Sequence, residues 1–486
     1  MRRAAVMGGI LLMANMAVAQ QATPPPPAPP RAANLPSPAE KTLGNGMRVI
    51  VVPKHDIPLV SARLMVRTGS EADPANLAGL AGITANLLTQ GTTTRGAEQI
   101  ARGIEALGAT LNSNAAWDTS YVNVSVMSSR LEQALSFVAD VARNPVFKTD
   151  EVERLREQSI DAVRVALQDP LSIARYVAAR VVFEDRPYGH ATTGTPDSLA
   201  QITREQIVAF HKRHYRPNNA VLILAGDVKP EVAFAAAEKL FGKWKSAPVK
   251  VTRSEGDAKV TDSKPRVIVV DMPDAGQAAV LVTRRGLRRV DPRYYPSLVA
   301  NSVLGGGYSA RLNQEIRIKR GLSYGATSTF ELRRDAGPFS AYAQTKNESA
   351  AEVAGIIIDE LDRLGAGELA ETELTPRKAV LVGGFGRALE TTAGIVERVA
   401  SLALHDLPLS EIGAYIPGVQ GVTGEAVRKF AASQLQGASA NIVIVGNASA
   451  FIEALRKRFG TVDVIPVEEL DLDTSALRKV KKAAFF

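Results

Sequence analysis

The stretch "NNAVLILAGDV", residues 218–228, decides the fold prediction because it returns near the end of the chain as "ANIVIVGNAS", residues 440–449. Both are short apolar runs between polar residues, a pattern typical of a strand buried on both faces. Each run is followed by a helical pattern that ends in Phe-Gly, and the spacing from the strand glycine to this pair differs by only two residues. The two stretches therefore look like copies of one unit.

A second echo occurs earlier in each copy and in the same order. "VRTGSEADP", residues 66–74, resembles "TRRGLRRVDP", residues 283–292, and each closes an apolar strand and opens a helical segment. Two echoes in one order predict a duplicated domain of roughly 210 residues, since internal similarity at a fixed period indicates repeated structure.

The order of patterns within the first copy is strand pair, helices, strand pair, helices, strand, helix. This order predicts an α+β fold in which helices pack on a mainly antiparallel sheet. The polar stretch between the copies has no apolar period, so we interpret it as a linker. The predicted organisation is a first domain at 41–247, a linker at 248–264, a second domain at 265–467 and a solvated basic tail at 468–486.

The N-terminus predicts export. Arg2 and Arg3 precede an apolar run that ends in the small-residue triplet Ala17-Val18-Ala19, which is typical of a secretory signal peptide at residues 1–19. Residues 20–40 are rich in proline and predict an extended spacer. The apolar run is shorter than the roughly 20 residues of a membrane span, and no later stretch reaches that length, so we expect no integral membrane segment after cleavage.

Composition excludes several classes of function. The 486 residues include no cysteine, which rules out disulfides, thiolate metal sites and a cysteine nucleophile. The hydrophobic share of 45% and the charged share of 22% are ordinary for globular proteins. The net charge of +8 is spread along the chain, and we therefore expect no nucleic-acid partner.

Several motifs together resemble a known family. They are "TGSEADP", "GLAGITANLLTQGT" (79–92), "GATLNSNAAWDTSY" (108–121), "HYRPNNAVLILAGDV" and "LGGGYSARLNQEIRIKRGLSYGA" (304–326). On these residues the chain is similar to the pitrilysin, or insulinase-like, zinc peptidases, especially the bacterial branch that resembles mitochondrial processing peptidase. The resemblance implies two homologous domains that form half of a clam-shell, with unfolded peptide enclosed by two such halves.

Catalytic members of that family carry His-x-x-Glu-His on a helix of the first domain, where two histidines one turn apart bind zinc and the glutamate activates water. The resemblance places these positions at Gly82, Ala85 and Asn86. The family's third ligand, a later glutamate, falls at Ala162, with Asp161 beside it. None of the four positions can perform its family role, so we expect no metal in this chain and zinc only in a partner.

Other metal or catalytic sites are weakly indicated. The pair His211 and His214 sits three residues apart on a predicted helix, and we expect it to be structural. No G-x-S-x-G serine motif is present. The triplet Gly305-Gly306-Gly307 lacks a following Lys-Ser/Thr, which favours tight backbone packing over phosphate binding.

The second domain offers Arg317 and Tyr324 in "EIRIKRGLSYG". In active family members, a matching arginine and tyrosine reach across to the zinc site and contact the peptide. A guanidinium and a phenol are suitable donors for a carbonyl that is becoming an oxyanion. The alternative is that Arg317 pairs with a local acid such as Glu315 and that Tyr324 fills the edge of a core.

The first domain offers a second set of candidate contacts. By resemblance, "ATLNSNAAW" contains the edge strand on which a peptide pairs as an added strand, with Asn112, Ser113, Asn114 and Ala115 as candidate contacts. Their polar character is equally suited to an exposed edge that binds nothing.

Three functions remain open. The resemblance favours a non-catalytic subunit of a periplasmic heteromeric zinc peptidase, whose partner is a homologous chain with the zinc motif and whose substrates are unfolded peptides. The second hypothesis is a proteolytically inactive peptide-binding or scaffold homodimer. The third is an autonomous metallopeptidase with an unorthodox site.

Overall fold

A computed structural model describes residues 37–249 and 264–479. The predicted signal peptide, most of the spacer, most of the linker and the end of the basic tail lie outside these ranges. Within them, no single helix is long and apolar enough to cross a membrane. The helices α12 (Glu371–Glu390) and α13 (Thr392–Leu404) meet those limits only when taken together, and the pair is bent by 112° at its junction.

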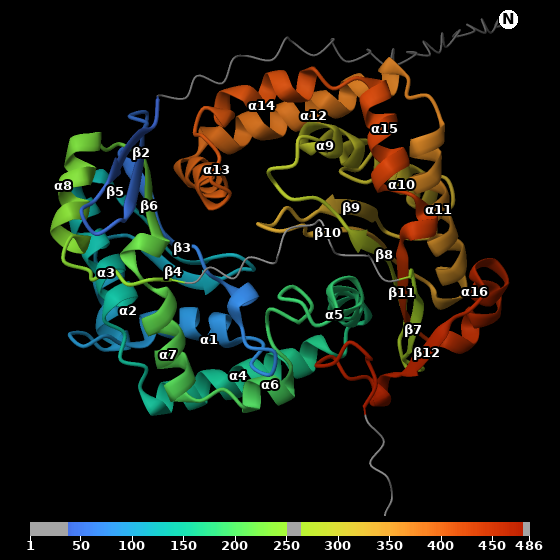
Figure 1. Cartoon of the computed structure of the whole chain (residues 1–486), viewed down its shortest axis with the longest axis horizontal. Helices are drawn as coiled ribbons and strands as arrows, with labels where there is room; N and C mark the ends of the chain where they lie inside the picture. The colour runs from blue at the N-terminus through green and yellow to red at the C-terminus, as the bar shows by residue number, and fades with distance from the viewer. Residues whose placement is uncertain (1–36, 250–263, 480–486) are drawn as a thin grey trace, which may run out of the picture. The chain divides into compact units, whose positions relative to one another are not determined.

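The first half of the chain contains a six-stranded sheet with the order β1-β2-β6-β3-β5-β4 (Figure 1). Only β2 and β6 run parallel, and the other neighbours are antiparallel. The strands are β1 (Ala39–Thr42), β2 (Arg48–Pro53), β3 (Leu59–Val66), β4 (Thr110–Ala115), β5 (Ser120–Met127) and β6 (Ala220–Gly226). All of β6 is buried, which explains its uninterrupted apolar run.

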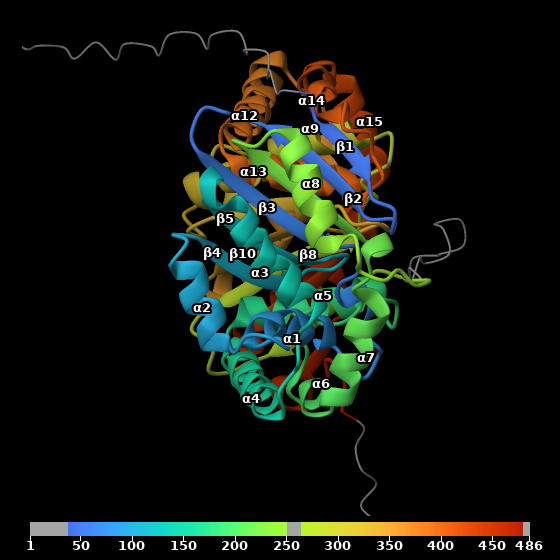
Figure 2. The same ribbon diagram turned by 90° about the vertical axis from the view of Figure 1, so that its left-hand side faces the viewer.

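Helices α3 and α8 cover one face of this sheet (Figure 2). The helices of the first half are α1 (Leu80–Leu87), α2 (Ala97–Glu105), α3 (Leu131–Arg143), α4 (Thr149–Ala166), α5 (Pro170–Phe183), α6 (Pro196–Ala200), α7 (Arg204–His214) and α8 (Pro230–Phe241). Val49 and Val51 of β2 belong to the core on this face, while the intervening Ile50 belongs to another core. The alternation of side chains along a strand therefore buries both faces of the sheet.

The second half contains a sheet with the order β12-β7-β11-β8-β10-β9. Apart from the first strand of each sheet, the two orders are the same: β7-β11-β8-β10-β9 corresponds to β2-β6-β3-β5-β4. The strands are β7 (Val267–Asp271), β8 (Ala278–Arg285), β9 (Ala326–Phe330), β10 (Pro338–Thr345), β11 (Asn441–Gly446) and β12 (Asp463–Pro466). The predicted duplication is thus confirmed, and the copies differ at the outer strand, which is antiparallel for β1 and parallel for β12.

The helices of the second half are α9 (Tyr294–Leu304), α10 (Arg311–Asn313), α11 (Ala350–Ala366), α12 (Glu371–Glu390), α13 (Thr392–Leu404), α14 (Glu411–Gln420), α15 (Gly424–Gln434) and α16 (Ile452–Phe459). A π-helical turn, Gln314–Ile318, follows α10. Ala300 of α9 is fully buried, as is Ala85 of α1, and the two helices hold the same place in their copies.

The two halves exchange one helix each (Figure 1). Ile173 and Val177 of α5, from the first half, belong to a core with strands of the second sheet. Conversely, Ile395 and Val399 of α13 share a core with Val221 and its neighbours in the first sheet. Each sheet therefore buries one face against its own half and the other face against a helix of the other half.

The segment after β12 differs from the solvated tail that the sequence analysis expects. Leu477 is fully buried in the core that contains α5, and Leu470 and Leu472 pack against it. Arg180 of α5 also donates to the Leu472 carbonyl oxygen at 3.1 Å. The spaced leucines, hidden among charged residues in the sequence, explain why this segment packs on the fold up to at least Lys479.

Candidate functional site

Helix α1 is positioned by the motif that precedes it. Gly79 adopts a left-handed backbone conformation, with φ of 94°, at the N-cap of the helix. Asp73 accepts hydrogen bonds from the backbone nitrogens of Gly79 and Ala81 at 3.0 and 2.8 Å. Burial raises the pKa of Asp73. This carboxylate therefore fixes the start of α1 from inside the protein.

Three of the four degenerate zinc positions meet in one cavity of about 350 Å³, here called the α1 cavity. Gly82 and Asn86 come from α1, and Ala162 comes from α4. Ala85 is fully buried and does not line this cavity. Instead, its carbonyl oxygen accepts a hydrogen bond from Ser113 at 2.7 Å, which ties α1 to β4.

The residues at these positions do not fit a zinc ion. Glycine, alanine and asparagine provide no imidazole or carboxylate, the groups that hold zinc in this family of sites. Asp161, the nearby carboxylate, is exposed and pairs with Arg164 at 3.1 Å. Within residues 37–249 and 264–479, no group of three or more His, Asp or Glu side chains is placed to hold a metal ion.

The two histidines of α7 pack against neighbouring rings and the backbone. His211 contacts the Ala142 carbonyl oxygen at 2.9 Å and stacks on Tyr215. His214 is buried against Phe210. Burial lowers the pKa of each histidine to about 4. Both rings therefore have structural contacts.

The glycine triplet before α10 packs tightly at two of its three positions. A Cβ atom on Gly305 would lie 2.4 Å from the backbone nitrogen of Ser328, and one on Gly306 would lie 2.9 Å from the Ser302 Cα atom. Only Gly307 has open space. This geometry favours the backbone-packing interpretation of the triplet.

Strand β4 lies at the edge of the first sheet, as the resemblance implies. Asn112 and Asn114 are exposed, and Ser113 and Ala115 are half-buried. Asn114 and Ala115 also line the α1 cavity, so the structure brings the candidate edge strand and the degenerate zinc positions together.

One amide on this edge is already occupied. The Asn114 side chain accepts a hydrogen bond from the Ala115 backbone nitrogen at 2.8 Å. Because the Ala116 nitrogen bonds across the hairpin to Thr119, the alternation of a strand directs the Ala115 nitrogen toward the free edge. An added strand would have to displace the Asn114 side chain from this position.

Arg317 and Tyr324 lie on the segment of the second half between α10 and β9. The Tyr324 side chain is 89% exposed, and the half-buried Arg317 holds its guanidinium 4.9 Å from the centre of the exposed Tyr308 ring. The Leu322 backbone is fixed at both of its polar groups: its nitrogen donates to Ile316 at 2.9 Å and its oxygen accepts from Thr345 at 2.6 Å.

The local alternatives for these two residues are wrong. Glu315 pairs with Lys319 and Arg320, each at 2.5 Å, and not with Arg317. Within the described residues, Arg317 has no ion pair. The exposure of Tyr324 also excludes a place at the edge of a core. Neither side chain lines the α1 cavity of its own chain.

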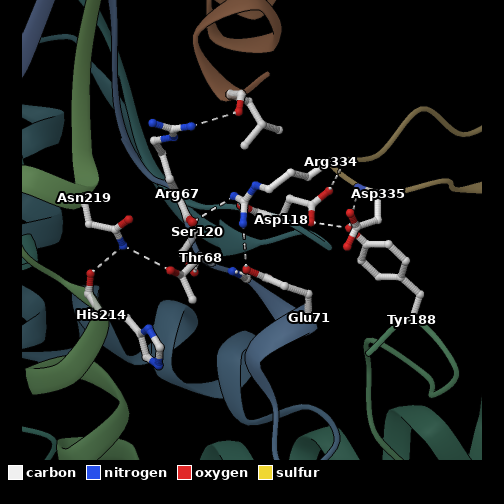
Figure 3. A network of polar contacts seen from close by, with 12 residues as sticks. Arg67, Thr68, Glu71, Asp118, Ser120, Tyr188, His214, Asn219, Arg334 and Asp335 are labelled. Carbon is white, nitrogen blue, oxygen red and sulfur yellow. Dashed lines mark hydrogen bonds and ion pairs between the residues drawn. The ribbon is translucent and has the colours of Figure 1, made fainter. Parts of the chain in front are cut away.

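A polar cluster around the buried Glu71 and Asp118 joins the two halves of the chain (Figure 3). Arg334, from the loop between β9 and β10, donates to the carbonyl oxygens of Arg67 and Asp118 at 2.9 and 3.1 Å and lies 3.5 Å from Glu71. Tyr188 donates to the Asp118 carboxylate at 2.6 Å. Burial, and secondarily the charge of Asp118, raises the pKa of Glu71 to about 8.

Comparisons with known proteins agree with this architecture. The sequence profile described as insulinase, peptidase family M16, matches residues 48–194, and that of the peptidase M16 inactive domain matches residues 201–381. An uncharacterized zinc protease of Mycobacterium leprae (strain TN) is 30% identical over 406 residues, which cover 82% of this chain and 90% of the relative.

Solved structures give the same result. The peptidase M16 inactive domain from Pseudomonas fluorescens is 27% identical, with a TM-score of 0.78, over 84% of this chain and 98% of the other. The periplasmic protease PqqL from Escherichia coli shares the fold at 19% identity, with a TM-score of 0.69, over 89% of this chain and 51% of the other. The chain therefore belongs to the insulinase family of peptidases, family M16.

Proposed function

We propose that this protein is a non-catalytic subunit of a heteromeric zinc peptidase. The partner is a homologous chain that carries His-x-x-Glu-His and binds the zinc ion. This chain completes the peptide-binding chamber and presents Arg317 and Tyr324 to the partner's site.

The observation that carries the proposal is the contrast between the two candidate sites. The α1 cavity holds Gly82, Asn86 and Ala162, none of which can bind or activate anything at a zinc centre. In contrast, Tyr324 is almost fully exposed, and Arg317 has no acidic partner among the described residues. Arginine and tyrosine are enriched where proteins bind partners, which supports a role outside this chain.

The two side chains suit a substrate that is held by another chain. A fixed guanidinium offers several donors in one plane, and the phenol of Tyr324 offers one more. Donors directed at a developing oxyanion are worth more in a closed, water-excluded chamber than in water. The contact of Arg317 with Tyr308 keeps the guanidinium oriented before a partner arrives.

Export is part of the proposal and rests on the sequence. Arg2, Arg3 and the apolar run up to Ala19 predict secretion, and a periplasmic location agrees with a chain that has no cysteine.

The proposal is tested by mixing purified chains. This chain is combined with a homologue from the same organism that carries the zinc motif, and hydrolysis of an unfolded peptide is followed. We expect activity only in the mixture, with Tyr324→Phe or Arg317→Ala lowering kcat by about 100-fold, the effect of one lost oxyanion donor. Arg102→Ala, a change at an exposed surface pair, is the matched control.

Three results would overturn the proposal. Full activity of a mixture in which this chain carries both Arg317→Ala and Tyr324→Phe would show that these residues do not take part in hydrolysis. Metal-dependent hydrolysis by this chain alone would favour an autonomous peptidase, and a stable homodimer that binds peptide without cleaving it would favour the scaffold hypothesis.

A further inference from the structure

A second cavity lies beside the α1 cavity, between α5 and the second sheet. It has a volume of about 340 Å³ and shares Tyr176 and Thr192 with the α1 cavity. We call it the aromatic cavity because its walls include Trp117, Tyr176, Phe183 and Tyr342. No motif pointed to it, because its walls come from both halves of the chain.

Part of the wall of this cavity is made of aromatic rings that are held by contacts with other rings. Trp117 meets Tyr188 edge to face, with ring centres 5.4 Å apart, and meets the His190 ring at 5.3 Å. Phe183, on α5, packs against Tyr188 in turn. Such a fixed aromatic surface suits a large apolar group, and the volume falls in the range of small-ligand sites.

Two arginines reach the same cavity. Arg333 is only 5% exposed, lies 4.1 Å from the Trp117 ring centre and pairs with Glu331 at 2.6 Å through Nη2. Its guanidinium also faces the Phe183 and Tyr188 rings, at 5.4 and 4.7 Å from their centres, and its buried Nε and Nη1 atoms have no hydrogen-bond partner among the described residues. Arg175 lies 5.2 Å from the Tyr342 ring centre and has no ion pair among the described residues.

Unpartnered buried donors require an explanation. Most buried polar atoms in proteins have a partner, and those without one often mark water or a ligand that is bound there. His190, which lines the cavity and is 8% exposed, makes no hydrogen bond through Nε2 among the described residues, but this atom lies 3.6 Å from the buried Asp73 carboxylate. The residues that line the cavity include two guanidinium groups and one carboxylate, that of Glu331, and Asp118 also attracts Arg333 from outside the lining.

We propose that the aromatic cavity binds the C-terminal residue of a peptide. A bulky apolar side chain packs among the rings of Trp117 and Tyr342, and the α-carboxylate lies between Arg333 and Arg175. The guanidinium fork matches the geometry of a carboxylate, and an apolar side chain next to a carboxylate is what this mixed lining accommodates.

The edge strand β4 leads from the α1 cavity to the aromatic cavity, as an extended peptide ligand would require. Asn114 and Ala115, at the end of β4, line the α1 cavity, and Trp117, two residues farther along, lines the aromatic cavity. A strand added beside β4 therefore leads toward the rings. The inference rests on the proposed function only in taking a peptide as the ligand, and it needs neither zinc nor a partner.

The test uses tryptophan fluorescence of the isolated chain. The protein has two tryptophans, so Trp244→Phe leaves Trp117 as the reporter. We expect an acetylated Gly-Gly-Gly-Phe peptide with a free C-terminus to change this fluorescence and to bind about tenfold or more tightly than its C-terminal amide, the effect of a charge-assisted hydrogen bond. Arg175→Ala should abolish this preference, whereas the exposed Arg164→Ala should retain it.

Three outcomes would overturn the inference. Equal affinity for the acid and the amide would show that the cavity does not recognise the α-carboxylate. No fluorescence change with either peptide would show that the peptide does not bind beside Trp117. If N-acetylphenylalanine bound as tightly as the longer peptide, the ligand would be a small aromatic carboxylate and not the terminus of a peptide. All three concern the isolated chain, so they leave the test of the proposed function with a zinc-bearing partner unaffected.

Discussion

Replacing Arg334 by alanine tests how the two halves are held together. The Arg334 side chain is only 11% exposed and connects a loop of the second half to the carbonyl oxygens of Arg67 and Asp118 in the first half. It is also the cation nearest to the buried Glu71 carboxyl group. The substitution removes both hydrogen bonds and leaves these groups in an interior that water does not readily reach.

The expected loss follows from the contacts. Hydrogen bonds to a charged group contribute about 1.5–3 kcal/mol each, so two of them predict a loss of about 3–6 kcal/mol in the free energy of unfolding. Glu71, with a pKa near 8 in the folded protein, is protonated at pH 6.5 and ionised at pH 9. The loss should therefore be larger at pH 9, where the variant buries a carboxylate without its cation.

The sign for the unmodified protein follows from the same group. Because the folded pKa of Glu71 lies above the ordinary value of 4.5, the folded state keeps a proton that the unfolded chain has lost. The contribution of Glu71 is complete below pH 4.5 and is lost as the pH rises through 8. Glu71→Gln should remove this part of the pH dependence.

Urea unfolding at pH 6.5 and pH 9, followed by fluorescence, measures these differences. Arg102→Ala is the matched control, because Arg102 and its partner Glu98 are both exposed and such pairs contribute at most about 1 kcal/mol. A loss below about 1 kcal/mol for Arg334→Ala would show that these hydrogen bonds do not hold the halves together. An equal increase in the loss from pH 6.5 to pH 9 in the Glu71→Gln background would show that Glu71 is not the titrating group.

Three further predictions follow from the site and its surroundings. Burial lowers the pKa of His214 to about 4, so its contribution to stability is present above pH 6.5 and is lost on acidification toward pH 4. The free energy of unfolding should fall by about 1.4 kcal/mol per pH unit in this range. His214→Phe should reduce this slope when urea unfolding is measured between pH 6.5 and pH 4. Gly82→His, Asn86→His and Ala162→Glu together should give one zinc per chain by elemental analysis, without peptide hydrolysis because Ala85 remains, and a metal-free triple variant would show that these positions are misassigned. Asn114→Ala should free the Ala115 amide and tighten peptide binding by about 2- to 10-fold by calorimetry, whereas Asn112→Ala, on the same strand, should not.

The duplication could be predicted because both copies contain the same short runs of apolar residues. The strands around residues 218–228 and 440–449 are buried on both faces, so they appear as continuous apolar runs in both copies. The equivalent helices α1 and α9 each place a fully buried alanine at the same point. Such signals depend on neighbours in the sequence, and a single chain therefore reveals them.

The exchange of α5 and α13 between the halves could not be predicted. An amphipathic helix shows that it has an apolar face but not which sheet that face covers. The same holds for Leu477, which is buried against a helix almost 300 positions away. The solvated tail was wrong for this reason, since a few spaced leucines among charges carry little periodic signal.

The candidate site divides in the same way. Gly82, Asn86 and Ala162 were placed by a resemblance in motifs, and the structure brings these three together in one cavity. The aromatic cavity was missed because Trp117, Arg175 and Arg333 lie in separate parts of the sequence. The only local signal is a tryptophan just after an edge strand, which is too common to assign a site.

A chain that works with a zinc-bearing homologue should be found together with it in the cell. The most direct measurement is a gentle affinity purification of the tagged protein from its native cell envelope, with the accompanying chains identified and zinc counted. We expect a homologue with His-x-x-Glu-His in near-equal amount and about one zinc per pair. A chain that is recovered alone, or as a homodimer without metal, would contradict it.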